Sequence, residues 1–135
     1  MIHAQNERQM KSHPILLEAT QSAANQILIT YDQRTDLESA THISNYWIRS
    51  TMETPTGIAT VGMSDALMSS NSIRPDMAQI TPIDNSNMRF HITFRVNAVS
   101  GVLYTVLPCF VSLEGMTGYM GANWGPASRN VFISM

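Results

Sequence analysis

Hydrophobic and polar residues alternate most clearly between residues 88 and 98. The even positions of this stretch are apolar, and the odd positions between them are polar or charged. The apolar set is Met88, Phe90, Ile92, Phe94, Val96 and Ala98. A period of two residues is typical of a β-strand with one buried face and one solvent-exposed face. We therefore predict a strand whose even-numbered side chains are buried.

A second apolar run extends from Val102 to Leu113, and the turn-forming pair Ser100-Gly101 separates the two runs. Folding the chain back at this pair places Phe94 opposite Leu107 and Ile92 opposite Cys109. The apolar residues of both runs then share one face, as cross-strand pairs do in a hairpin. The sequence thus predicts an antiparallel hairpin from residue 88 to residue 113.

Other segments with β-branched or aromatic residues between turn signals predict shorter strands. They are residues 26–31, 43–51, 58–63 and 130–135. Residues 54–57 read as a turn, and Ser64 is placed to cap a short helix over residues 65–68. Residues 14–24 fit either a short helix or an extended arm. Tyr46 and Trp47 are adjacent in a predicted strand, so only one of them is expected in the core.

This pattern of strands, without helix–strand alternation, predicts an all-β protein. We expect an antiparallel β-sandwich or small barrel of the jelly-roll type with at most one short helix. The expected organisation is a polar N-terminal arm or short helix over residues 1–25 and a single β-sandwich domain over residues 26–135. Residues 32–41 and 115–128 are expected to be long loops.

Composition narrows the classes of partner. The 135 residues are 44% hydrophobic and 13% charged, with a net charge of −2, a composition that favours a folded domain. Basic residues are scattered, so we do not expect binding to nucleic acid. The apolar runs are too short for a membrane helix, and no signal peptide is expected in this chain.

The residue types that usually carry catalysis are present without the required spacing. The four histidines lack metal-ligand spacing, and Cys109 is expected to be a buried, inert thiol. The Gly62–Asp65 segment lacks the second glycine of a nucleophile elbow. We therefore predict no catalytic residue, no metal site and no cofactor, and we expect that the protein is not an enzyme.

The glycine-rich loop from Gly115 to Pro126 holds the best candidate binding residues. Tyr119 and Trp124 offer flat amphipathic rings, and Asn123 offers an amide that both donates and accepts hydrogen bonds. These three residues are the candidate ligand-binding set. The alternative is a structural role at the end of the sandwich, and we expect that role for Trp124 and an exposed position for Tyr119.

Low charge, a neutral polar composition and a chain that ends inside a predicted strand suit a subunit completed by its neighbours. We predict a non-catalytic, self-associating structural protein, most consistent with a viral or phage particle component: a capsid, decoration or fibre-tip subunit. Its expected partners are copies of itself, with a trimer as one option, and other particle proteins. The expected location is the virion or the extracellular space. The alternative is a carbohydrate- or receptor-binding module that uses the loop from Gly115 to Pro126.

Overall fold

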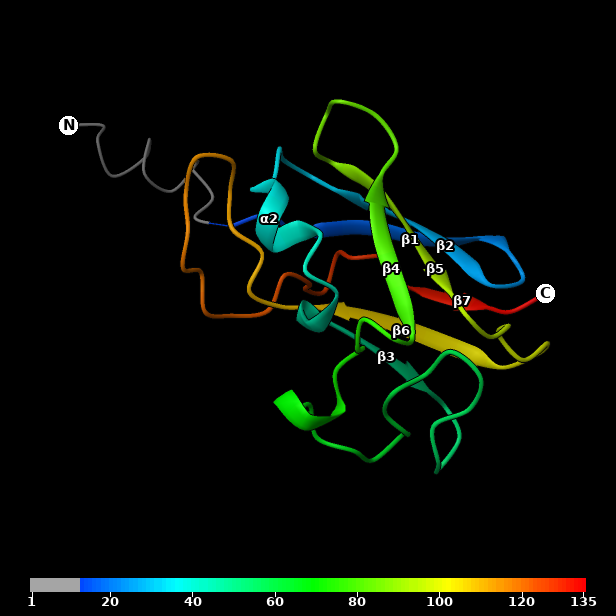
Figure 1. Ribbon diagram of the computed structural model, residues 1–135. Helices are drawn as coiled ribbons and strands as arrows, with labels where there is room; N and C mark the ends of the chain where they lie inside the picture. Colours follow the sequence, from blue (N-terminus) through cyan, green and yellow to red (C-terminus); the bar gives the residue numbers. More distant parts are fainter. Residues whose placement is uncertain (1–12) are drawn as a thin grey trace.

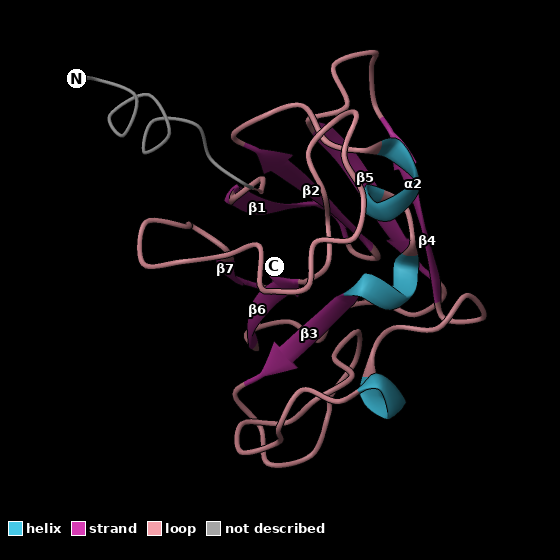
Figure 2. Ribbon diagram, turned by 90° about the vertical axis from the view of Figure 1, so that its left-hand side faces the viewer, coloured by secondary structure: helices cyan, strands magenta, loops and turns pink. Residues whose placement is uncertain are grey.

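The computed structural model describes residues 13–135, which form two antiparallel β-sheets in two layers (Figure 1, Figure 2). One sheet has the strand order β1-β2-β5-β4, and the other has the order β3-β6-β7. The strands are β1 (Leu16–Ala23), β2 (Gln26–Tyr31), β3 (Tyr46–Ser50), β4 (Ala78–Pro82), β5 (Arg89–Phe94), β6 (Leu103–Pro108) and β7 (Val131–Ile133). The predicted all-β antiparallel sandwich is confirmed.

Helical structure in the described residues is limited to short segments. They are α2 (Leu37–Ala40), η1 (Ile43–Asn45) and η2 (Ser69–Asn71). Asp36 caps α2, because its side chain accepts a hydrogen bond of 3.0 Å from the backbone N–H of Ser39. This helix lies inside the segment that was expected to be a loop, whereas the helix expected after Ser64 does not form.

The alternation correctly identifies the buried face of β5 but extends past the strand, because β5 ends at Phe94 and Val96, which was expected to be buried, is 54% exposed. Phe90 and Ile92 are fully buried and Phe94 nearly so, whereas Arg89 and Arg95 are exposed. β5 lies inside the four-stranded sheet, between β2 and β4. Its apolar face packs in the main hydrophobic core between the two sheets.

The predicted hairpin between residues 88–98 and 102–113 is wrong. β5 pairs with β2 and β4, whereas β6 pairs with β3 and β7 in the opposite sheet. The connection over residues 95–102 therefore passes from one layer to the other. Two apolar strand faces complement each other across a core as well as within one sheet, so alternation does not identify the pairing partner.

β6 is buried on both faces. Tyr104 and Val106 face the main core, whereas Leu107 and the following Cys109 join a second cluster with Trp47 and Val61. We call this second group the outer cluster. β3 is also covered on both faces, so Tyr46 is buried in the main core and Trp47 is buried in the outer cluster. The expectation that only one of them lies in the core is therefore wrong.

The other predicted strands match the observed ones to different degrees. Residues 26–31 form β2, and the segment 130–135 contains β7. Residues 16–23, left open between helix and extended arm, form β1 and pair with β2. Residues 58–63 form no strand and make only an isolated bridge between Val61 and Arg49, and β4 was not expected. Residues 1–12 of the expected N-terminal arm lie outside the described residues.

Two buried tyrosines connect the layers. The hydroxyl groups of Tyr31 in β2 and Tyr46 in β3 lie 2.6 Å apart, and Tyr46 donates a hydrogen bond of 2.6 Å to the carbonyl of Ala40 at the end of α2. Both side chains are fully buried. Burial raises the pKa of both hydroxyl groups, because a phenolate would lose its hydration.

We expect this pair to make folding sensitive to alkaline pH. The folded state keeps both tyrosines protonated, whereas the unfolded chain releases protons near pH 10. The free energy of unfolding is therefore unaffected well below pH 10 and falls above it, by up to about 1.4 kcal/mol per pH unit for each tyrosine. Urea unfolding between about pH 8 and pH 11 measures this slope.

Tyr31→Phe provides the control for this prediction. It removes one titrating group and one hydrogen bond, so it should lower stability at pH 7 by about 1 kcal/mol and make the alkaline slope shallower. An alkaline slope that is unchanged in Tyr31→Phe would contradict the assignment.

Candidate binding surfaces

Asn123 anchors the glycine-rich loop to the body of the sandwich. Its side-chain amide donates to the carbonyls of Pro14 (2.8 Å) and Val111 (2.9 Å) and accepts from the N–H of Val111 (2.9 Å). Its backbone carbonyl accepts from the N–H of Leu16, and its backbone N–H donates to Pro108. The residue is fully buried. Asn123 therefore joins the loop to the start of β1 and the end of β6.

Tyr119 is fixed along the loop itself. Its hydroxyl donates a hydrogen bond of 2.8 Å to the carbonyl of Ala122, and its ring stacks on His13 with 4.2 Å between ring centroids. A Cβ at Gly121 would lie 2.6 Å from the Tyr119 hydroxyl oxygen, so only glycine allows this close approach. One ring face is thus covered by His13, and Tyr119 is half-buried rather than exposed.

Trp124 is the most accessible of the three predicted residues, with 37% of its surface exposed. Burial raises the pKa of Cys109, and a hydrogen bond with the Trp124 side chain partly opposes this rise. The three predicted residues are neighbours in the loop, but their side chains do not converge. Asn123 faces the interior, Tyr119 packs on His13, and Trp124 reaches the thiol of the outer cluster.

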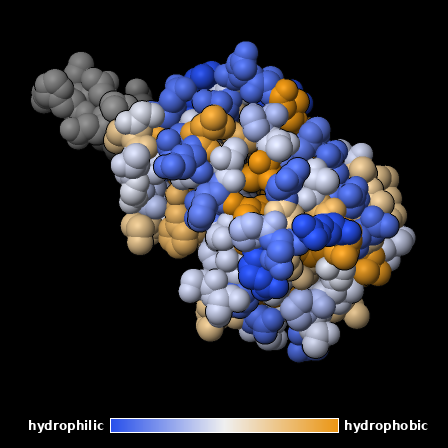
Figure 3. Space-filling view, in the orientation of Figure 1, coloured by the Kyte–Doolittle hydropathy of each residue, from blue (hydrophilic) through white to orange (hydrophobic). Residues whose placement is uncertain are grey.

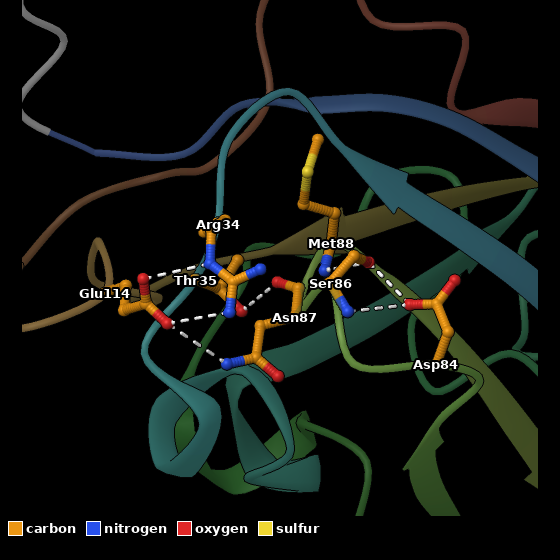
Figure 4. A network of polar contacts seen from close by, with 7 residues as sticks. All are labelled: Arg34, Thr35, Asp84, Ser86, Asn87, Met88 and Glu114. Atoms are coloured by element: carbon orange, nitrogen blue, oxygen red, sulfur yellow. Dashed lines mark hydrogen bonds and ion pairs between the residues drawn. The ribbon is translucent and has the colours of Figure 1, made fainter.

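A polar network holds the segment just before this loop (Figure 4). Arg34 donates two hydrogen bonds to Glu114, of 2.9 and 3.0 Å, and these lower the pKa of the Glu114 carboxyl. The side-chain amide of Asn87 donates a longer hydrogen bond of 3.5 Å to Glu114. The backbone carbonyl of Asn87 accepts a hydrogen bond of 2.6 Å from the hydroxyl group of Thr35. Three surface segments are joined in this way, at residues 34–35, 84–88 and 114.

A groove lies beside Phe110, which was not among the predicted site residues. Phe110 has a backbone φ of 68° and is 38% exposed. It borders two adjacent hollows, of about 380 and 430 Å³, which also share His42 and Asn45. Glu38 and Thr117 line the first hollow, whereas Trp47, Met68 and Arg74 line the second. We call the two hollows together the Phe110 groove.

The sequence carried a signal for an exposed aromatic ring at residue 110. Phe110 lies between Cys109 and Val111, both assigned to a buried face, so the alternation placed its ring on the solvent side. A phenylalanine on a predicted solvent face is unusual and can mark a binding surface.

The edge of the smaller sheet forms a second surface. β7 pairs with β6 through Val131–Ile133, and the exposed fractions of Val131 and Ile133 are 47% and 63%. A hollow of about 390 Å³ separates β7 from β1. Two hydrogen bonds join β1 to the residues that flank β7. The backbone N–H of Ala19 donates to the carbonyl of Arg129, and the backbone N–H of Met135 donates to the side-chain oxygen of Gln21.

The structure also contains exposed aliphatic side chains elsewhere. On the face shown in Figure 3, hydrophobic residues lie in small groups among polar ones. In residues 13–135, no three His, Cys, Asp or Glu side chains gather in a way that could hold a metal ion. No helix within the same residues is long and apolar enough to cross a membrane.

We expect Asn123→Ala to destabilise the protein by about 2–4 kcal/mol, because it leaves buried backbone groups of Pro14 and Val111 without partners. Asn85→Ala, at an exposed asparagine in a surface turn, is the matched control and should change stability by less than about 0.5 kcal/mol. Urea unfolding of both variants makes the comparison. Equal, small effects would show that the amide does not anchor the loop.

Comparison of the sequence with known protein families and with curated proteins finds no match. The structure is similar to "Structure of surface layer protein SbsC, domains 1-6", with a TM-score of 0.59 and 14% identity. It is also similar to "Crystal structure of the S-layer protein rSbsC(31-844)", with a TM-score of 0.57 and 15% identity. In both cases the match covers 96% of this chain and 14% of the other chain. A third structure, the N-terminal part of the bacterial S-layer protein SbsC, matches over 88% of this chain and 23% of its own, with a TM-score of 0.55 and 13% identity. At these identities the likeness shows a shared fold.

Proposed function

We propose that the chain is a non-catalytic β-sandwich domain of a self-assembling extracellular protein layer. The observation that carries this proposal is the similarity of 96% of the chain to part of surface layer protein SbsC. The chain spans only 14% of the length of that protein, as expected for one domain among several. The narrower prediction of a virus or phage particle component rests on composition alone and involves the same self-association.

The strand edges support association between copies. β4 and β7 are the last strands of their sheets, and neither contains a charged residue. β1 flanks the outer side of β7, so β7 offers a partner its exposed side chains. Charged side chains commonly protect edge strands against pairing with other chains. In β7 the alternate residues Val131 and Ile133 also present aliphatic side chains to solvent. An uncharged edge with exposed aliphatic side chains is suited to contact with a second copy of the chain.

The electrostatics of the described residues support a non-catalytic role. The shifted carboxyl pKa values belong to Glu114, bonded to Arg34, and Asp84, bonded to Ser86 at the surface. The strongly raised values belong to the buried pair Tyr31 and Tyr46. Each of these shifts has a structural cause in a hydrogen bond or in burial, and a catalytic group is not needed to explain any of them.

Sedimentation velocity at concentrations from about 1 to 100 μM tests the proposal. We expect the wild-type protein to form oligomers as its concentration rises, and Val131→Lys to shift the distribution towards monomer, because it adds a charge to the contacting edge. Val96→Lys is the matched control, since Val96 is 54% exposed but lies on the crossing between the sheets.

The control variant should associate like the wild type. A wild-type protein that remains monomeric over the whole range would overturn the proposal. Equal loss of association in both variants would show that β7 is not the contacting edge.

A further inference from the structure

Phe110 combines an unfavourable backbone conformation with a ring that packs on Trp47 and stays partly exposed. A φ of 68° lies in the left-handed region, which is sterically unfavourable for a bulky side chain. Such strain persists where the surrounding structure imposes it, and it is concentrated at ligand-binding positions. Here Cys109 and Val111 on either side are buried, and the N–H of Phe110 donates to Gly121. The strain holds an aromatic ring at the surface rather than in a core.

The ring of Phe110 is available for stacking. Trp47 contacts it at an interplanar angle of 72°, with 6.3 Å between the ring centroids. In an edge-to-face contact of this kind, at least one face of the Phe110 ring is left uncovered by Trp47. The ring also stands between the two hollows of the Phe110 groove. A flat ligand that enters the groove would therefore meet an aromatic surface.

Polar groups around the ring offer hydrogen bonds, with two carboxylates in the first hollow and one guanidinium in the second. Asn45 lines both hollows, and its amide nitrogen donates a hydrogen bond to the carbonyl of Ser39. His42, Glu38 and Thr117 are exposed and line the same groove. On the opposite side Arg74 forms a loose ion pair with Asp76, at 3.4 Å. This mixture of donors and acceptors suits a ligand rich in hydroxyl groups and without net charge.

The size of the groove agrees with such a ligand. Each hollow, of about 380 or 430 Å³, is within the range of small-molecule sites, about 300–1,000 Å³. Because the hollows adjoin at Phe110, one chain-like ligand could occupy both. An anionic ligand is disfavoured by the carboxylates of Asp36 and Glu38 in the first hollow.

We propose that the Phe110 groove binds a neutral oligosaccharide, with one sugar unit in each hollow and the ring of Phe110 stacked on the apolar face of a sugar. Thr117 and Gly118 bring the glycine-rich loop to the rim of this site, whereas Tyr119 and Trp124 lie outside it. The proposal is independent of self-association, since neither Val131 nor Ile133 lines the groove.

Isothermal titration of the full chain with maltohexaose, cellohexaose and chitohexaose, each up to about 10 mM, tests this site. We expect binding of at least one of the three. Phe110→Gly should weaken that binding at least about tenfold, because it removes the ring. The melting temperature should change little, because glycine accepts the positive φ and this gain offsets the lost contact with Trp47. Phe110→Tyr keeps the ring and should retain the affinity.

Trp124→Ala tests the alternative site in the glycine-rich loop, because Trp124 is 37% exposed and Phe110 is 38% exposed. Trp124 reaches the groove only through Cys109, so Trp124→Ala should weaken oligosaccharide binding far less than Phe110→Gly does. Loss of binding in Trp124→Ala but not in Phe110→Gly would move the site to the glycine-rich loop and overturn the proposal. Absence of binding to all three sugars would also overturn it. Because sedimentation of Phe110→Gly should match the wild type, failure of this proposal is distinguishable from failure of self-association.

Discussion

The smaller sheet buries side chains on both of its faces. Its outer face, which points away from the main core, must therefore be covered by the long connections between strands. Trp47, Leu107 and Cys109 project away from the main core and need a cover of their own. The connection over residues 51–77 supplies part of it: the indole N–H of Trp47 donates to the carbonyl of Met68 at 3.0 Å and to the side chain of Asn71 at 2.8 Å. The chain packs so closely here that a Cβ at Gly62 would lie within 2.1 Å of the carbonyl oxygen of Glu53. Without strand structure of its own, this connection covers the outer cluster by local contacts.

The sequence predicted burial better than it predicted pairing. In β5 each side chain alternates between core and solvent, so a period of two residues identified both the strand and its buried face. In β6 the residues from Val106 to Pro108 are all buried, so alternation there carried no information about neighbours. β4 was missed because it is short and has only two buried apolar side chains, Ala78 and Ile80. Pairing depends on contacts between distant segments, which a local pattern does not encode.

The binding surfaces show a similar limit. Tyr119, Asn123 and Trp124 were selected because their side chains can stack and form hydrogen bonds, and the structure shows that those same abilities are used within the protein. A residue type alone does not distinguish a hydrogen bond to a ligand from one to the backbone. Phe110 is chemically simpler, and its interest comes from a backbone angle and from its position between two hollows. Neither property is visible before the chain is folded.

The positions of the two tryptophans make the outer cluster observable on its own. Trp47 is buried in that cluster, whereas Trp124 is partly exposed at its border, and the sequence has no other tryptophan. Neither residue lies in the main core between the sheets. Tryptophan fluorescence, excited at a wavelength that tyrosine does not absorb, therefore reports on the cover of the smaller sheet, with one emitter shielded from a dissolved quencher and one accessible to it. If that cover were to open while the sandwich stayed intact, the emission spectrum would change, and far-ultraviolet circular dichroism would stay nearly constant.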